Sequence, residues 1–290
     1  MGGVAMGGQS ILVGLIGAGI RSSLSPAMHE REGAAQGLRY SYRLIDLDVL
    51  GLTAAALPDL LASAEREGFS GLNITFPCKQ AVIEWLDDLS PDARAIGAVN
   101  TVLFAGGRRI GHNTDWSGFA EGFRRALPEV RRERVVLFGA GGAGAAVAHA
   151  LLSLQTRELV LVDTETRRAR ELAQGLCERF GAGRAVAIDD PAAAMQGADG
   201  VVNATPVGMA KFPGMPLPAD LLARELWVSD VVYFPLETQL LSEARARGCR
   251  TMGGDGMAVF QAVEAFRLFS GRSADAQRML AHFAELTQRS

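Results

Sequence analysis

The sequence predicts an α/β protein with two domains, and three features of the chain lead to this prediction. Short apolar runs that favour strands alternate with Ala- and Arg-rich stretches that favour helices along nearly the whole chain. The length of 290 residues suits two domains of ordinary size. A glycine-rich loop near the middle of the chain follows an apolar run and precedes an alanine-rich stretch. This order is typical of a turn between a strand and a helix.

The order of the elements follows from these runs. Strands are expected at the apolar, β-branched runs, which are residues 11–16, 40–44, 71–75, 99–104, 135–138, 159–162, 200–203 and 227–232. Helices are expected at the longer stretches between them, which are residues 26–36, 50–67, 80–87, 142–154 and 166–179. This alternation is typical of a sheet of parallel strands joined by helices.

The domain boundary is expected near residues 113–120. A helix beginning at Trp116 leads into Arg131-Arg132-Glu133-Arg134, a charged run that is typical of a solvated hinge. The segment from Asp255 onward has helical periodicity and could pack back on the first domain. We therefore predict a first domain at residues 1–114, a second at residues 115–254, and C-terminal helices at residues 255–290 that return to the first.

Composition and charge exclude several classes of partner. The net charge is −3 and the arginines are mixed with acidic residues, so no nucleic-acid partner is expected. No apolar run reaches the ~20 residues of a membrane helix, and residues 1–10 lack the basic start of a signal peptide. We therefore expect a disordered leader and no membrane partner.

Three widely spaced cysteines indicate reduced thiols and a cytoplasmic location. The four histidines form no cluster with metal-ligand spacing, and no metal is predicted.

Two glycine-rich loops follow predicted strands. The first, Gly17-Ala18-Gly19-Ile20-Arg21-Ser22, has serine where a third glycine would be needed. The second, Gly139-Ala140-Gly141-Gly142-Ala143-Gly144, follows an apolar run and opens a helix. This G-x-G-x-x-G pattern allows a tight turn, close approach of a pyrophosphate, and close packing of helix on strand. The second loop therefore predicts a dinucleotide site in a Rossmann domain.

An acidic residue supports the same site and indicates which nucleotide it takes. Asp163 follows the next predicted strand and lies 163 − 144 = 19 positions beyond the last glycine, close to the ~20 expected for a ribose-binding acid. Its carboxylate could accept hydrogen bonds from both ribose hydroxyls and would repel a 2′-phosphate. NAD is therefore favoured over NADP, although Arg167 or Arg168 could still hold a phosphate.

Lysine is rare in this chain. Only Lys79 and Lys211 are lysines, which leaves 29 − 2 = 27 arginines among the basic residues. An ammonium group can release its proton when its surroundings lower its pKa, whereas a guanidinium stays charged. Lys79 is therefore a candidate proton-transfer group, and the alternative is a lysine that happens to lie on a surface loop.

Polar residues gather at the predicted strand ends of the first domain. Ser23 and Ser25 precede a helix N-terminus, where backbone N–H groups favour an anion such as a carboxylate. Ser25 could instead be a plain N-cap with Pro26 at the first helical position, and Asp115 could equally cap the helix at Trp116. The other polar residues at strand ends are Asn73, Thr75 and Asn100.

Seven motifs together resemble the shikimate dehydrogenase family in order and spacing. They are Ser23-x-Ser25-Pro26-x-Met28-His29, Asn73-x-Thr75-x-Pro77-x-Lys79, Gly97-Ala98-Val99-Asn100-Thr101, Asn113-Thr114-Asp115, the Gly139–Gly144 loop, Asn203-Ala204-Thr205-Pro206-x-Gly208-Met209, and Gly256-Met257-x-x-x-Gln261-Ala262. The match runs over nearly the whole chain. It implies an N-terminal α/β substrate domain completed by the C-terminal helices, with a Rossmann domain between.

The resemblance also implies roles for individual residues. Lys79 and Asp115 would be the catalytic pair at the reacting hydroxyl, since oxidation of an alcohol needs a base for its proton. The substrate would be a carboxylated cyclohexane or cyclohexene polyol. Its implied contacts are Ser23 and Ser25 at the carboxylate and Asn73, Thr75, Asn100, Tyr233 and Gln261 elsewhere. The implied cofactor contacts are Gly139, Ala140, Gly141, Gly142, Ala143, Gly144, Asp163, Arg168, Asn203, Thr205, Pro206, Met209, Val231 and Gly254.

The sequence most resembles the NAD-using quinate/shikimate dehydrogenases. Asp163-Thr164-Glu165-Thr166 stands where NADP-dependent biosynthetic members commonly carry an Asn-Arg-Thr type sequence. Quinate-active members can have threonine at the position of Ser25, so shikimate is a safer expectation than quinate. The alternatives are an NADP-dependent biosynthetic shikimate dehydrogenase, a methylenetetrahydrofolate dehydrogenase, and a regulator that binds NAD and a metabolite without turnover. The chain is expected to be a monomer or a homodimer.

Overall fold

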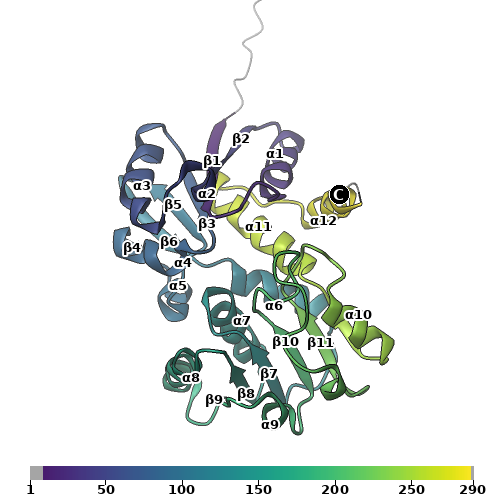
Figure 1. The fold of residues 1–290 in the computed structure, drawn as a ribbon. Helices are drawn as coiled ribbons and strands as arrows, with labels where there is room; N and C mark the ends of the chain where they lie inside the picture. The colour runs from purple at the N-terminus through teal and green to yellow at the C-terminus, as the bar shows by residue number, and fades with distance from the viewer. Residues whose placement is uncertain (1–8, 289–290) are drawn as a thin grey trace, which may run out of the picture. The chain divides into compact units, whose positions relative to one another are not determined.

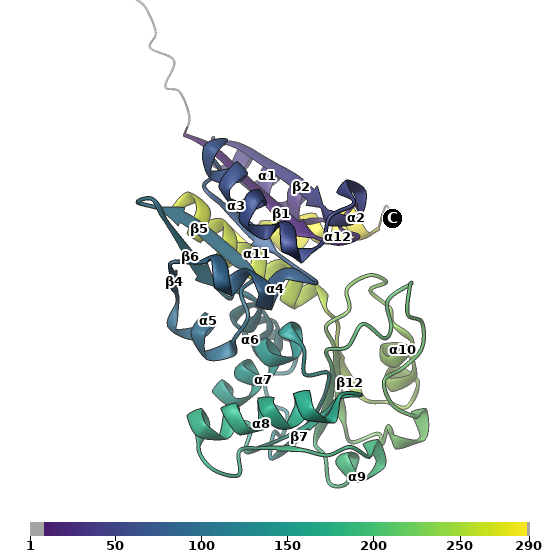
Figure 2. The same cartoon turned by 60° about the vertical axis from the view of Figure 1, so that its left-hand side comes forward.

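The computed structural model describes residues 9–288 and confirms the predicted α/β fold class (Figures 1 and 2). The chain divides into two compact units, of which unit 1 comprises residues 1–114 and 262–290 and unit 2 comprises residues 115–261. Each unit has a six-stranded sheet among its described residues. The predicted leader lies outside the described residues except for its last two, and Ser10 already begins the first strand.

The sheet of unit 1 is mixed, whereas the sequence indicated parallel strands. Its strand order is β2-β1-β3-β5-β6-β4, and β5 runs antiparallel to both of its neighbours, β3 and β6. The reason is the turn at Gly106-Gly107, where both residues have positive φ and join β5 to β6 as a two-residue hairpin. The strands are β1 (Ser10–Gly17), β2 (Arg39–Asp46), β3 (Gly71–Ile74), β4 (Asp88–Leu89), β5 (Thr101–Ala105) and β6 (Arg108–His112).

Helices cover both faces of this sheet. On one face Tyr40 and Tyr42 pack in a cluster with Phe266 and Phe269 of α11. On the other face Leu61 of α3 packs in a cluster with residues of β1, β3 and β5. The helices of this unit are α1 (Ser25–Ala35), α2 (Leu47–Leu50), α3 (Leu57–Arg66), α4 (Cys78–Ala81), α5 (Pro91–Ile96), the later part of α11 (Asp255–Ser270) and α12 (Ala276–Thr287).

Two predicted helices of unit 1 are interrupted. The helix expected at 50–67 is wrong in its first part, because Gly51 at φ +64 ends α2 and Pro58 then lies in the first turn of α3. Between them lies the 3₁₀ turn Ala54–Ala56. The helix expected at 80–87 is likewise replaced by α4 and the 3₁₀ turn Val82–Trp85.

The sheet of unit 2 is parallel and doubly wound. Its order is β12-β11-β10-β7-β8-β9, so the chain starts at the centre with β7, winds outward to β9, returns to β10 and winds outward the other way. This is the strand order of the Rossmann fold. The strands are β7 (Arg134–Phe138), β8 (Glu158–Val162), β9 (Ala185–Ala187), β10 (Gly200–Asn203), β11 (Trp227–Asp230) and β12 (Arg250–Met252).

Alternate residues of these strands face two separate cores. Val135 and Leu137 pack in a cluster with residues of α6, α7 and α8, whereas Val136 and Phe138 pack in a cluster with residues of α9 and α10. The helices are α6 (Asp115–Ala126), α7 (Gly142–Ser153), α8 (Thr166–Phe180), α9 (Pro191–Met195) and α10 (Gln239–Ala246). The 3₁₀ turn Ala219–Leu221 precedes β11.

The charged run at residues 131–134 is not a hinge between the units, because it lies inside unit 2. The indole Nε1 of Trp227 donates to the carbonyl of Arg131 over 2.8 Å, and Arg134 is the first residue of β7. The second division of the chain falls after Gln261 rather than after residue 254. The start of α11 packs on α6 so closely that a Cβ on Gly118 would lie 2.6 Å from the Gln261 nitrogen.

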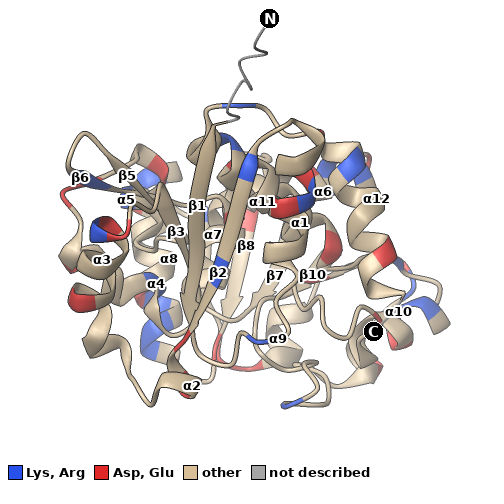
Figure 3. Ribbon diagram, turned by 90° about the horizontal axis from the view of Figure 1, so that it is seen from above, with Lys and Arg blue, Asp and Glu red and all other residues tan. Residues whose placement is uncertain are grey.

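Charged residues of both signs are spread over the helices and loops, and β1 and β3 carry none (Figure 3). Among the described residues, none of the helices has the length and apolar character needed to cross a membrane.

Candidate active site

The glycine loop of unit 2 has the geometry of a pyrophosphate-binding turn. Gly139 has φ +98, and a Cβ there would lie 2.8 Å from the Ala204 oxygen. A Cβ on Gly144 would lie 2.0 Å from the Gly139 oxygen, which shows how closely α7 meets β7. A Cβ on Gly141, by contrast, would meet no atom within 4 Å among the described residues beyond its two chain neighbours. The first and third glycines therefore make the turn and the packing, and the second leaves the space that a pyrophosphate needs.

Asp163 lies beside this loop at the carboxyl end of β8. Its Oδ2 accepts a hydrogen bond from the backbone N–H of Ala140 over 2.7 Å, and its Oδ1 accepts one from Glu165 over 2.8 Å. Arg168 approaches the same carboxylate, with Nη1 at 3.9 Å from Oδ1, while its Nη2 is bound to Glu165 at 2.9 Å. The carboxylate is thus fixed where a ribose could meet it.

The other predicted cofactor residues lie at the end of β10 and in the segments that follow β10, β11 and β12. Asn203 Oδ1 accepts from the N–H of Thr205 over 3.0 Å and from its hydroxyl over 2.6 Å. The N–H of Met209 donates to Pro206, and 42% of Met209 is exposed. Two further predicted residues pack against each other after β11 and β12, since a Cβ on Gly254 would lie 2.4 Å from the Val231 oxygen.

In unit 1 the predicted carboxylate site lies at the start of α1. Leu24 is the N-cap of α1 and Ser25 is its first helical residue, so the alternative of Ser25 as a plain N-cap is wrong. No side chain in the described part of the protein caps this helix. The Ser23 hydroxyl accepts from the N–H of Ser25 over 3.3 Å. In the first glycine-rich loop the backbone N–H groups are bound by a side chain of the protein itself. Those of Gly19 and Ile20 both donate to the Asp46 carboxylate over 3.0 Å.

Asn73 belongs to a buried hydrogen-bond network. Its Oδ1 accepts from the Tyr42 hydroxyl over 2.8 Å, and its Nδ2 donates to the Thr101 hydroxyl over 3.0 Å and to the Asn100 carbonyl over 3.3 Å. Only 6% of Asn73 is exposed. These partners determine which amide atom is oxygen and which is nitrogen.

Asn100 connects this network to the residue before Asp115. Its Oδ1 accepts from the N–H of Thr114 over 2.7 Å, and its Nδ2 donates to the Thr114 hydroxyl over 2.9 Å. Thr114 is the last residue of the first segment of unit 1, and Asp115 begins α6 in unit 2. Asp115 is buried, with 5% exposed.

Lys79 lies in α4, directly after β3. Its side chain is half-buried, and its backbone carbonyl accepts from Val99 over 2.8 Å. The loops after β1 and β3 meet here, since Ala18 donates to Phe76 over 2.9 Å. Cys78 beside it is buried, and this burial raises the pKa of its thiol, so the thiol stays protonated. Lys79 is therefore anchored in the same unit as Ser23, Ser25, Asn73, Thr75 and Asn100.

The remaining predicted substrate residues lie in unit 2. Tyr233 follows β11, and desolvation and then the negative charge of Asp115 raise the pKa of its phenol, although 39% of the residue is exposed. Gln261 is the last residue of this unit, and its Nε2 donates to Ala258 over 2.9 Å. Unit 2 thus brings Tyr233 near Asp115.

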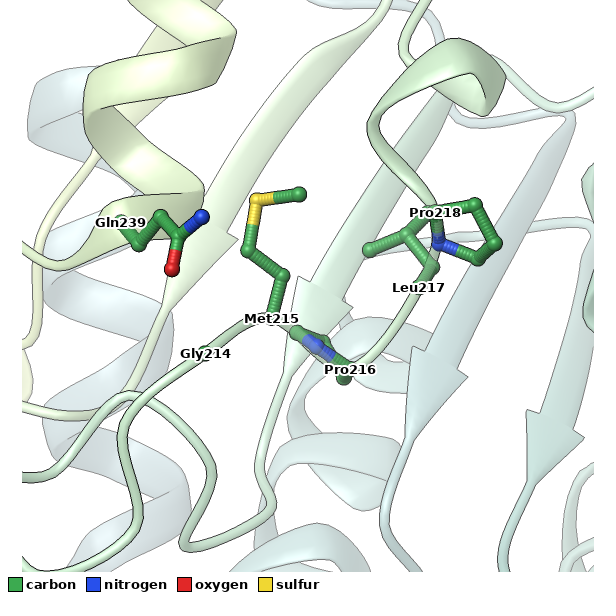
Figure 4. Close-up of a pocket in the computed structure, with 6 residues that line it drawn as sticks. All are labelled: Gly214, Met215, Pro216, Leu217, Pro218 and Gln239. Atoms are coloured by element: carbon green, nitrogen blue, oxygen red, sulfur yellow. The ribbon is translucent and has the colours of Figure 1, made fainter.

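A separate shallow pocket in unit 2 contains none of the predicted site residues (Figure 4). Its lining residues are Gly214, Met215, Pro216, Leu217, Pro218 and Gln239. Because its lining has one side-chain amide and no charged or nucleophilic side chain, it lacks a side chain for proton transfer.

Comparison with known proteins identifies the family. A family model described as the shikimate dehydrogenase substrate binding domain matches residues 15–102. A shikimate dehydrogenase (NADP(+)) of Streptomyces avermitilis is 60% identical over 280 residues, which cover 96% of this chain and 96% of that protein. The chain belongs to the shikimate dehydrogenase family. It is an NAD(P)-dependent oxidoreductase that acts on a CH–OH group.

Other members of the shikimate dehydrogenase family are named for the other nucleotide. A quinate/shikimate dehydrogenase (NAD(+)) of Corynebacterium efficiens is 48% identical, over 97% of this chain and 100% of that protein. The solved quinate dehydrogenase of Corynebacterium glutamicum in complex with NAD has a TM-score of 0.89 at 47% identity, covering 96% of this chain and 99% of that one. Similarity alone therefore does not decide between NAD and NADP.

Three residues of this shikimate dehydrogenase family member were missed by sequence reasoning. Tyr42 orients Asn73, Asp46 holds the loop before Ser23, and Asp230 is hydrogen-bonded to Asn203 over 2.9 Å. A signal for Tyr42 was available, because a buried tyrosine on a strand needs a partner for its hydroxyl. For Asp230 the sequence showed only an acidic residue at the end of an apolar strand, with no indication of its partner Asn203.

Proposed function

We propose that the protein oxidises shikimate to the 3-dehydro product with NAD, reversibly, and that it also accepts quinate. The observation that supports NAD most directly is the placement of Asp163. Two backbone N–H groups fix its carboxylate beside the glycine loop, at 2.7 and 2.8 Å. Ribose hydroxyls could donate to the oxygen lone pairs that remain, whereas a 2′-phosphate would meet a negative charge.

The names of relatives support this proposal in part. The Corynebacterium efficiens relative that is named for NAD is 48% identical, and the Corynebacterium glutamicum quinate dehydrogenase solved in complex with NAD is 47% identical. The Streptomyces relative named for NADP is 60% identical. NADP-dependent reduction of 3-dehydroshikimate is therefore the second candidate function, and the exposed Arg168 near Asp163 favours it, since a guanidinium can pair with a phosphate.

We assign most of the substrate-binding residues to unit 1, and the nucleotide-binding residues together with the substrate residues Tyr233 and Gln261 to unit 2. Ser23 and Ser25 would bind the substrate carboxylate at the uncapped start of α1, where backbone N–H groups favour an anion. The other proposed substrate residues are Asn73, Thr75, Asn100, Tyr233 and Gln261. The proposed location is the cytoplasm, and the proposed state is a monomer or a homodimer.

The proposed chemistry is paired loss of a hydride and a proton from one CH–OH group. The nicotinamide supplies the hydride acceptor when the nucleotide is bound. Lys79 and Asp115 would act together at the reacting hydroxyl, where the lysine amine takes the proton and the carboxylate holds the amine in place. Because the reaction is reversible, the same pair would take the proton during oxidation and return it during reduction.

Initial rates with four reactant pairs test this proposal. Shikimate and quinate are each combined with NAD and with NADP, and kcat/KM is measured for all four. We expect the highest kcat/KM for shikimate with NAD and a lower value for quinate with NAD. A clear preference for NADP would establish the second candidate function, and no turnover with any pair would refute both.

A further inference from the structure

The last residues of two adjacent strands form a buried polar pair. Asn203 ends β10 and Asp230 ends β11, and the two are partners in the strand register. Asn203 Nδ2 donates to Asp230 Oδ1 over 2.9 Å, and both residues are 0% exposed. Polar groups at this depth are costly unless every one of them finds a partner.

Asn203 fixes the loop that follows β10. Besides the two bonds from Thr205, its Nδ2 donates to the Val207 carbonyl over 2.8 Å, and the Val207 N–H donates to the Thr205 hydroxyl over 3.1 Å. The loop therefore folds around the amide of Asn203. Its shape depends on where that amide points.

Asp230 fixes the loop that follows β11 and the helix after it. Its Oδ1 accepts from the N–H of Val232 over 3.0 Å, and its Oδ2 accepts from the Thr238 hydroxyl over 2.8 Å. Thr238 in turn caps α10 by accepting from the N–H of Leu241. Gly208, at φ +107, lies beside this carboxylate, since a Cβ there would be in van der Waals contact with Asp230 Oδ2 at 3.6 Å. One carboxylate thus joins both loops and α10.

The strand order indicates which part of the nucleotide these loops meet. The sheet runs β11-β10-β7-β8, with the glycine loop after β7 and Asp163 after β8. A dinucleotide whose pyrophosphate lies at the β7 loop and whose adenosine ribose meets Asp163 extends its other half toward β10 and β11. That half carries the nicotinamide.

We propose that Asp230 is a positioning residue that holds the β10 and β11 loops against the nicotinamide half of the bound nucleotide. The proposal rests on the proposed function for the direction of the dinucleotide. Asp230 itself touches neither nucleotide nor substrate in this account. It acts through Asn203, Thr205 and Val232.

The charge of Asp230 is what distinguishes this role from ordinary packing. Burial raises the pKa of its carboxyl to about 6, although hydrogen bonds from Val232, Thr238 and Asn203 oppose this rise. Among the described residues no Lys or Arg forms an ion pair with it. A carboxylate accepts from all three donors at once, whereas an amide would point its NH₂ at one of them. Burying the Asp230 carboxylate costs free energy, and in return its charge holds the loops that follow β10 and β11.

The test compares two nucleotide ligands that differ in the nicotinamide. Asp230→Asn is assayed for kcat, for KM of shikimate, and for Kd of the nucleotide, NAD or NADP, that the wild type binds more tightly. Binding of the matching ADP-ribose, which lacks nicotinamide, is measured in parallel. We expect kcat to fall at least tenfold and the full nucleotide to bind at least threefold more weakly, while binding of the ADP-ribose and KM for shikimate change less than twofold.

Controls separate positioning from general damage to the fold. Ser229→Ala removes a buried hydroxyl that has no hydrogen-bond partner among the described residues. This residue directly precedes Asp230, and the variant should leave all four quantities unchanged. Thr238→Val removes one donor to the carboxylate and should lower kcat and weaken nucleotide binding less than Asp230→Asn does. Thr238→Ser keeps the hydroxyl and should behave like the wild type. These two variants also test the proposal if Asp230→Asn does not fold.

The outcomes separate the proposal from the proposed function. Equal weakening of both ligands, or an unchanged kcat in Asp230→Asn, would overturn the positioning role even if the wild type oxidises shikimate. If the wild type turns over none of the tested substrates, the proposed function fails, and the comparison of the two ligands still decides the role of Asp230.

Discussion

The hydroxyl of Tyr42 donates a hydrogen bond to Oδ1 of Asn73 over 2.8 Å, in the buried interior of unit 1. Asn73 Nδ2 is bound to Thr101 and Asn100, so the Tyr42 bond is what completes the orientation of the amide. Tyr42 therefore controls a side chain that we assign to substrate binding without itself being assigned there.

Tyr42→Phe should raise KM for shikimate about two- to tenfold, since one lost hydrogen bond corresponds to roughly 0.5–1.5 kcal/mol. The Kd of the nucleotide should not change. Tyr40→Phe is the matched control, because the Tyr40 hydroxyl bonds to Nδ1 of His29 over 3.0 Å rather than to Asn73. Equal effects of the two variants on KM would refute the role of Tyr42.

Asp163→Asn should lower kcat/KM for NAD about tenfold or more, because hydrogen bonds to a charged acceptor are worth roughly 1.5–3 kcal/mol. The ratio of kcat/KM for NADP to that for NAD should rise, since the charge that repels a 2′-phosphate is gone. Arg170→Ala on α8, the helix that follows Asp163, is the control, because Arg170 pairs with Asp189 rather than with Asp163. An unchanged nucleotide ratio in Asp163→Asn would count against Asp163 as the selective residue.

Arg278→Ala should destabilise unit 1 by about 1–3 kcal/mol. Arg278 donates from Nε and Nη2 to the two oxygens of Glu32 at 2.7 and 2.8 Å, and the Glu32 side chain is 0% exposed, so the variant leaves a buried carboxylate without its cation. Arg31→Ala breaks a pair with Glu285 between the same two helices, but both partners are about half exposed, and it should cost less than about 1 kcal/mol. Urea unfolding measures both, and equal losses would contradict the difference.

Acid should destabilise the protein through His29. Burial lowers the pKa of His29 to about 3 from its ordinary 6.5, and the opposing charge of Glu32 does not offset this. In the unfolded chain His29 is protonated below about pH 6.5, whereas in the folded chain it is protonated only below about pH 3. This group's contribution to stability is therefore lost as the pH falls, by up to about 1.4 kcal/mol per pH unit.

His29→Phe should make the free energy of unfolding depend less steeply on pH between 6 and 4. Phenylalanine does not titrate and suits a site beside Tyr40, Tyr42, Phe266 and Phe269. The slope rather than the absolute stability is the readout, since the variant also loses the bond to Tyr40. The same slope in variant and wild type would contradict the lowered pKa of His29 in the folded protein.

Features encoded in one continuous segment were predicted from the sequence. The Gly139–Gly144 loop and the strand before it carry the whole signal for a strand, a turn and a helix within a dozen positions. The hairpin at Gly106-Gly107 was missed because its second strand, Arg-Arg-Ile-Gly-His, reads as a charged loop. The short strands β9 and β12 have three residues each, too few for a periodic pattern.

The supporting residues of the site could not be predicted because their partners are distant in sequence. Tyr42 and Asn73 are 31 positions apart, and Asn203 and Asp230 are 27 apart. Their contacts depend on which strands pair and in which register, and local patterns carry neither. The network of Asn100 with Thr114 likewise appears only when the strands are paired.

The measurement that tests the proposed function most directly is turnover of shikimate with NAD by the wild type, Lys79→Ala and Lys79→Arg. We predict that both variants bind NAD with near-native Kd and lose kcat by two or more orders of magnitude, because arginine keeps the charge but does not give up its proton. Near-native turnover by either variant would contradict proton transfer through Lys79.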